Sequence, residues 1–117
     1  MEGLNQYMSQ FNEVVNSAII TDANGENIAD AFAKVVEELN TIKTNGGTVY
    51  LVGNGGSSGI VSHVSIDLIN ACKIKAHPIT DNSVLTCMAN DYGYENVFSE
   101  ALKTMIAPGD LLIAVSS

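Results

Sequence analysis

Apolar residues in the first part of the chain recur at three- and four-residue steps, the spacing of one face of a helix. The first series runs from Leu4 to Ile19 and predicts a helix. After a turn-like segment at 21–25, a second series runs from Ile28 to Ile42 and stops before Gly46-Gly47, a typical helix end. The pattern therefore predicts two leading amphipathic helices, the second over about 26–45.

Beyond these helices the pattern alternates between short apolar runs and helical spacing. The apolar runs predict strands at 48–52, 76–80 and 110–115. Helical spacing predicts helices at 58–71, from a cap at Asn82 or Ser83 to Ala89, and at 95–106. The first run is β-branched, aromatic and continuously apolar, which is typical of a strand buried on both faces. Strands that alternate with helices predict an α/β fold with a parallel sheet.

The last predicted strand has the composition of a strand inside a sheet, yet the sequence ends at Ser117 with nothing to cover it. We therefore expect the chain to be part of a longer domain. No repeat or linker interrupts it. The expected organisation is a helical pair at 1–47 followed by the N-terminal part of an α/β domain at 48–117.

Composition narrows the classes of function. Apolar residues make up 46% of the sequence and charged residues 15%, which favours a folded, heavily buried chain. The formal charge is −8, from 13 acidic and 5 basic residues, with no basic cluster to neutralise a nucleic acid backbone. The chain has no signal-peptide pattern and no apolar run of about 20 residues. We expect a cytoplasmic protein that binds neither nucleic acid nor membrane.

The two cysteines lack the spacing of a metal site or a redox motif. Cys72 and Cys87 stand singly among apolar residues. Free cysteine is among the most buried residue types. Both are expected to be reduced core residues.

A glycine-rich segment, Gly53-Asn54-Gly55-Gly56-Ser57-Ser58-Gly59, lies between a predicted strand and a predicted helix. Backbone N–H groups and the positive end of the helix dipole converge at such a place, so it suits an anion such as phosphate. A purely structural turn is the alternative. The dinucleotide pattern fits poorly, because Ser58 stands where its third glycine would be and Asp81 follows too late. No nucleotide cofactor is expected.

His63 and Asp67 are spaced i and i+4 and therefore share one face of the predicted helix. Two metal ligands or an acid/base pair would need this arrangement, although the same spacing also occurs in surface hydrogen bonds. His77 has no partner at such a spacing and is expected to be structural. Tyr92 and Tyr94 are expected to pack rather than catalyse.

Several motifs in this order resemble one known family. They are VGNGGS at 52–57, His63 with an acidic residue four positions later, NDYGYE at 90–95 with Val97-Phe98, and PGDLLI at 108–113. Together they are similar to bacterial phosphoheptose isomerases, members of the sugar isomerase (SIS) domain superfamily. The resemblance spans nearly the whole chain. It implies a three-layer sandwich with a flavodoxin-like parallel sheet, preceded here by two helices.

The resemblance implies an aldose–ketose isomerase that converts sedoheptulose 7-phosphate to a heptose 7-phosphate for lipopolysaccharide, capsule or related glycans. Family members are usually homotetramers whose active sites combine more than one subunit. The positions that match the family's substrate contacts are Asn54, Gly55, Gly56, Ser57, Asn90, Asp91, Ser116 and Ser117. Ser116 and Ser117 match only the start of the family's phosphate loop, so we expect 117 residues alone to be inactive.

His63 and Asp67 match a histidine and a catalytic glutamate, a pair that some members use as half of a zinc site. The resemblance thus implies Asp67 as the catalytic base, and His63 with Asp67 as ligands if Zn²⁺ is bound. Asp67 is shorter than glutamate by one methylene, so either the base reaches less far or the site is altered. A non-catalytic SIS-domain regulator that binds sugar phosphates, or an inactive product, are the alternatives.

Overall fold

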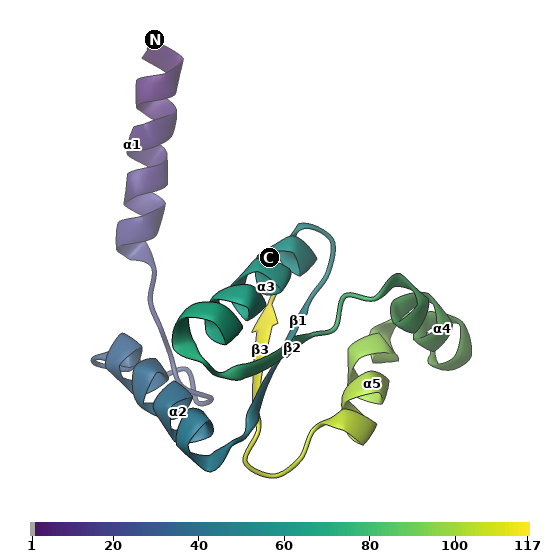
Figure 1. Ribbon diagram of the computed structural model, residues 1–117. Helices are drawn as coiled ribbons and strands as arrows, with labels where there is room; N and C mark the ends of the chain where they lie inside the picture. Colours follow the sequence, from purple (N-terminus) through teal and green to yellow (C-terminus); the bar gives the residue numbers. More distant parts are fainter. Residues whose placement is uncertain (1) are drawn as a thin grey trace. The chain divides into compact units, whose positions relative to one another are not determined.

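The computed structural model describes residues 2–117 (Figure 1). The chain forms two compact units, Met1–Val35 and Val36–Ser117. The first contains helix α1 (Glu2–Ser17) and the start of helix α2 (Ala31–Asn45), and the second contains the rest of α2 and the sheet. Both predicted leading helices are therefore present.

Helix α1 confirms the first predicted helix but buries none of its residues. Its apolar side chains are exposed, among them Tyr7 and Phe11 at 63% and 55%. Ala31 is the one buried hydrophobic residue of the described part of Met1–Val35. A segment this short with so little burial is too small to be stable by its own core.

The second helix begins later than its apolar spacing predicts, at Ala31 rather than near residue 26. The segment before it is held as a turn by Asp22, whose Oδ1 accepts the N–H of Asn24 and of Glu26 at 2.8 and 2.9 Å. These hydrogen bonds lower the pKa of Asp22, and the bond from Glu26 has the largest effect. A bridge between Thr21 and Asn27 closes the turn. The predicted start was wrong because local side-chain hydrogen bonds outcompete helical spacing here.

The second unit alternates strands and helices as predicted. Its elements after α2 are β1 (Thr48–Gly53), α3 (Gly56–Asp67), a π-helical turn (Leu68–Cys72), β2 (Lys75–Pro78), α4 (Asn82–Tyr92), a 3₁₀ turn (Tyr94–Asn96), α5 (Val97–Met105) and β3 (Leu111–Val115). The boundaries differ from the predicted ones by a few residues. Asp81 caps α4, since its carboxylate accepts the N–H groups of Ser83 and Val84.

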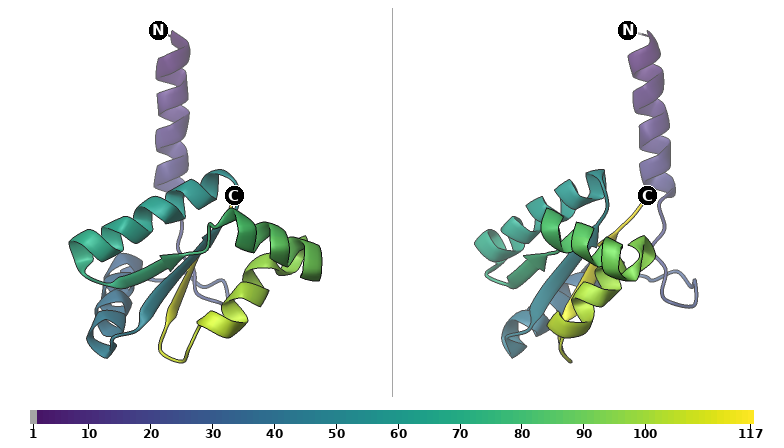
Figure 2. Two further views of the ribbon diagram at one scale, coloured as in Figure 1. Left: turned by 45° about the vertical axis from the view of Figure 1, so that its right-hand side comes forward. Right: turned by 90° about the vertical axis from the view of Figure 1, so that its right-hand side faces the viewer.

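The three strands form one parallel sheet in the order β2-β1-β3. In its register Tyr50 lies opposite His77 on one side and Leu112 on the other. The views in Figure 2 show α3 on one face of the sheet and α4 and α5 on the other. The predicted α/β fold with a parallel sheet is confirmed. Within residues 2–117, however, β1 is the central strand and β3 pairs with β1 alone.

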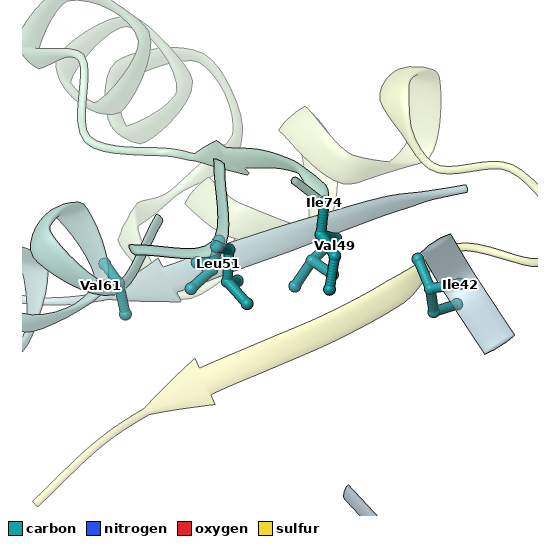
Figure 3. Packing of buried hydrophobic residues seen from close by; sticks show 6 residues of the cluster. Ile42, Val49, Leu51, Val61 and Ile74 are labelled. Atoms are coloured by element: carbon teal, nitrogen blue, oxygen red, sulfur yellow. The ribbon is translucent and has the colours of Figure 1, made fainter. Parts of the chain in front are cut away.

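Each face of the sheet has its own apolar cluster. On the α3 face the buried residues are Ile42, Val49, Leu51, Val61, Leu68 and Ile74, five of which are labelled in Figure 3. On the other face they are Tyr50, Val52, Ile79, Ala101 and Leu102. Val49 and Leu51 are fully buried while Tyr50 and Val52 face the opposite helices, so β1 is covered on both sides as predicted. His77 contacts Tyr50 edge to face, with ring centroids 5.9 Å apart.

Both cysteines are free but exposed, so the prediction that they are core residues was wrong. Cys72 ends the π-helical turn. Cys87 lies on α4, whose core side is formed by the partly buried Val84 and Leu85. Apolar sequence neighbours did not indicate burial here, because the helix turns its other face to the sheet.

Asp110 joins the amino ends of the two paired strands. Its Oδ1 accepts the N–H of Thr48 and its Oδ2 accepts the N–H of Ala107, both at 2.8 Å. These hydrogen bonds lower the pKa of Asp110 from its ordinary value of 3.8, and the bond from Thr48 has the largest effect. The positive charge of Lys75 lowers the pKa further. One carboxylate thereby fixes where β1 begins and where the α5–β3 turn closes.

The junction between β1 and α3 requires glycine at Gly53. A Cβ there would lie 2.8 Å from the backbone carbon and oxygen of Ser57, closer than real Cβ contacts allow. Gly59, within α3, has no atom within 4 Å of the corresponding position. The first turn of α3 therefore packs directly on the last residue of the strand.

We expect Asp110→Asn to lower the Tm at pH 7, because the amide can accept at only one of its two terminal atoms. The pKa of Asp110 is depressed in the folded state, so its stabilisation is present above the ordinary pKa of 3.8 and is lost as pH falls through the folded value. Thermal unfolding followed by circular dichroism should show the difference at pH 7 and a smaller one below pH 3.8. A Tm difference independent of pH would contradict this role.

We expect Gly53→Ala to destabilise the chain by about 1–3 kcal/mol, because the added methyl group overpacks the junction. Gly59→Ala is the matched control, and we expect it to stabilise by about 0.5–1 kcal/mol through its higher helix propensity. Urea unfolding measures both. Equal effects of the two substitutions would show that the junction does not require close approach.

Candidate functional site

The candidate site lies at the carboxyl edge of the sheet. Gly53 ends β1 and Val115 ends β3, and the two residues are register partners. Because the strands are parallel, the loop that begins at Asn54 and the pair Ser116-Ser117 leave the sheet side by side. Ligands of open α/β sheets bind at this edge.

The glycine-rich loop leads directly into the amino end of α3, a position that favours anions. Gly55 has φ 57° and ψ −123°, a conformation that favours glycine. The Ser58 hydroxyl donates to Gly55 O at 2.7 Å, whereas the Ser57 hydroxyl has no hydrogen-bond partner within residues 2–117. Gly56 begins α3, so the positive end of the helix dipole meets the loop. Of the two serines, Ser57 is thus the one with a hydroxyl available to a ligand.

His63 and Asp67 lie one helical turn apart on α3. Their Nε2 and Oδ2 atoms are 3.7 Å apart, and the side chains are 81% and 65% exposed. This geometry leaves both groups accessible to a ligand. The described residues include no group of three or more histidine, cysteine, aspartate or glutamate side chains suited to a metal ion. The pair can therefore supply two ligands to a metal but not a full set.

Asn90 and Asp91 lie in the last turn of α4. Asp91 Oδ1 accepts the Asn90 side-chain amide at 3.0 Å, and Oδ2 lies 3.5 Å from Cys87 Sγ. The hydrogen bond with Asp91, reinforced by its negative charge, raises the pKa of the Cys87 thiol. Sequence reasoning missed this contact, although the i, i+4 spacing of Cys87 and Asp91 could have indicated it.

A small cavity connects the glycine-rich loop with the segment that follows α4. Its volume is about 70 Å³, and it is lined by Asn54, Leu85, Tyr94, Val97 and Phe98. Two of the motifs that stand apart in the sequence, GNGGS and NDYGYE, thus meet in space. Tyr94 and Phe98 form part of its wall, but Tyr92 and Tyr94 are 54% and 65% exposed, so within residues 2–117 the expectation that both tyrosines pack is wrong.

No helix within residues 2–117 has the length and apolar character needed to cross a membrane.

The curated proteins with similar sequences reported below are both named phosphoheptose isomerase. The phosphoheptose isomerase of Shewanella sp. strain ANA-3 is 33% identical over 120 residues, which cover 97% of this chain and 59% of that protein. The phosphoheptose isomerase of Geotalea daltonii is 32% identical over 104 residues, or 84% of this chain and 54% of that protein. The chain thus spans somewhat more than half the length of these curated relatives. The resemblance inferred from the motifs is confirmed.

Solved structures give the same result for the fold. A phosphoheptose isomerase from Neisseria gonorrhoeae matches 73% of this chain and 46% of its own with a TM-score of 0.67 and 30% identity. One from Francisella tularensis matches the entire chain and 63% of its own with a TM-score of 0.70, at 22% identity. The second likeness concerns the fold alone.

The family model of the SIS domain matches residues 6–117, which include α1 as well as the sheet. The expected boundary at residue 47 between a helical pair and the α/β domain stays a prediction. With the parallel sheet, the loop at its carboxyl edge and a match over nearly the whole length, the chain belongs to the SIS domain family.

Proposed function

We propose that the protein is a sugar-phosphate isomerase that interconverts sedoheptulose 7-phosphate and a heptose 7-phosphate. The observation that carries the proposal is that a glycine-rich loop leads into the start of α3, where the helix dipole favours an anion, while the same helix carries an accessible His63–Asp67 pair. The name shared by the sequence relatives supports the substrate class.

The phosphate would bind at the carboxyl edge of the sheet. The Ser57 hydroxyl, the start of α3 and the adjacent Ser116-Ser117 pair all offer donors there. Asn54, Gly55 and Gly56 shape the loop, and Asn90 and Asp91 would contact the sugar hydroxyls. Holding the phosphate fixes the open-chain sugar, so that the correct proton faces the base.

Asp67 would act as the base. Its carboxylate removes the proton from the carbon next to the carbonyl, and the carbonyl oxygen gains a proton, which gives an enediol. The carboxylate then returns its proton to the former carbonyl carbon as the other oxygen loses its own proton to become the new carbonyl. No atom is gained or lost overall, as an aldose–ketose interconversion requires. The Asp67 side chain is 65% exposed, which leaves its carboxylate accessible to a substrate.

If Zn²⁺ takes part, His63 and Asp67 would hold it with further ligands from outside the described residues. A zinc ion would stabilise negative charge on the substrate oxygens. We further propose a cytoplasmic location and a role in supplying heptose for lipopolysaccharide, capsule or a related glycan, as the family resemblance implies.

The first unit supports a proposal about assembly. Helix α1 has no buried residue, and a hollow of about 480 Å³ in the same unit is lined by apolar side chains that include Ile19 and Phe32. Large apolar side chains exposed together on one helix are typical of an interface. We propose that copies of the protein form a homotetramer through this unit.

In the full-length protein, Asp67→Asn should lower the turnover of sedoheptulose 7-phosphate by at least about 100-fold, because the amide cannot accept the proton. Binding of the substrate should change little. Asp67→Glu, which restores the family residue, should keep or raise activity. Turnover is measured by discontinuous assay and binding by calorimetry.

One result would contradict the role of Asp67, and another would contradict the isomerase function. Undiminished turnover in Asp67→Asn would remove the residue from the mechanism. A wild-type protein that binds the sugar phosphate without turning it over would favour the regulator class.

Phe11→Glu should reduce the molecular mass measured by light scattering at micromolar concentration, because a charge then occupies the apolar face of α1. Burial of one phenylalanine contributes about 1.5–3 kcal/mol per copy. Ser9→Glu adds the same charge on the opposite side of α1 and serves as the control, with no expected change. A monomeric wild-type protein would reject the assembly.

A further inference from the structure

Thr80 follows the carboxyl end of β2 by two residues. Leu51 pairs with Pro78, the last residue of β2, and the Ile79 N–H group donates to Leu51 O at 2.9 Å as part of that pair. If this register is extended by two residues, Thr80 comes level with Gly53, which pairs with Val115 on its other side. Thr80 therefore stands at the same edge as the glycine-rich loop and Ser116.

Thr80 also lies on the face of the sheet against which α3 packs. Ala76 packs in the cluster on the α3 face, whereas Ile79 belongs to the cluster on the opposite face. Since strand residues alternate between faces, Thr80 has the same parity as Ala76 and lies on the face where α3 begins. Ser57 is in the first turn of that helix.

The Thr80 hydroxyl is available for a ligand. Its residue is half-buried, and within residues 2–117 the hydroxyl has no hydrogen-bond partner. Thr86 provides the contrast, because its hydroxyl donates to the carbonyl oxygen of Asn82 at 2.7 Å within its own helix. Thr80 is therefore a candidate ligand contact, because its hydroxyl makes no hydrogen bond within the described fold and it lies at the edge where ligands bind.

The charges of the second unit make such a contact important. The sequence has no arginine, and the lysines of this unit lie on segments that lead into the amino ends of strands. Lys73 donates to Asn70 O and Lys75 to Gly46 O, each at 2.7 Å, while Lys103 pairs with Glu100. Among residues 2–117, the groups at the carboxyl edge that can bind a phosphate are therefore backbone N–H groups, the helix dipole and neutral hydroxyls.

We propose that the Thr80 hydroxyl is a further donor to the substrate phosphate, beside Ser57. The proposal rests on the proposed function, because it adds a contact to the same phosphate site. It extends that site from β1 and β3 to the end of β2, so that all three strands of the described sheet contribute to one anion site.

The test compares three substitutions in the full-length protein, with calorimetric Kd for sedoheptulose 7-phosphate and steady-state KM and kcat as readouts. Thr80→Val keeps the side-chain shape and removes the hydroxyl, so Kd and KM should rise about 10-fold, as expected for a hydrogen bond to a charged group. Thr80→Ser keeps the hydroxyl and should stay near wild type. Thr86→Val should change nothing, and Ser57→Ala gives the effect of losing the neighbouring donor.

The outcomes separate this contact from the function on which it rests. Weaker binding in Thr80→Val with unchanged kcat and Tm, and recovery in Thr80→Ser, supports the contact. Unchanged Kd in Thr80→Val alongside weaker binding in Ser57→Ala overturns it and leaves the isomerase proposal intact. A wild-type protein that neither binds nor converts the sugar phosphate overturns both.

Discussion

The approach of α3 to the end of β1 is the constraint on which the rest of the site depends. Because Gly53 has no side chain, the backbone of Ser57 can pack directly against it. This contact sets the start of α3 at the carboxyl edge of the sheet. It thereby fixes the position of the Ser57 hydroxyl, and one to three turns further along it fixes His63 and Asp67. Helix α3 therefore carries the three side chains, of Ser57, His63 and Asp67, for which we propose roles in phosphate binding and proton transfer.

The elements of the second unit could be predicted from the sequence because local pattern and tertiary packing agree there. Val49 and Leu51 face one set of helices while Tyr50 and Val52 face the other, which explains why the run is apolar throughout. The order of strands and helices then implied parallel pairing, and the glycine-rich loop fell at the expected edge. Parallel geometry alone brings Ser116 next to that loop.

Other features depended on interactions that apolar spacing does not encode. The start of α2 was displaced because Asp22 hydrogen-bonds the backbone of the following turn. The exposure of Cys87 follows from which side of α4 meets the sheet. Thr80 could be recognised only from the register of β2 against β1, which no single-sequence pattern specifies.

The central claim is that this edge of the sheet positions a sugar phosphate for proton abstraction by Asp67. Deuterium incorporation from D₂O into the carbon next to the carbonyl of sedoheptulose 7-phosphate, followed by NMR with the full-length protein, tests it most directly. The account predicts incorporation with the wild-type protein and its loss in Asp67→Asn while the sugar phosphate still binds. Binding of the sugar phosphate to the wild-type protein without any incorporation would contradict it.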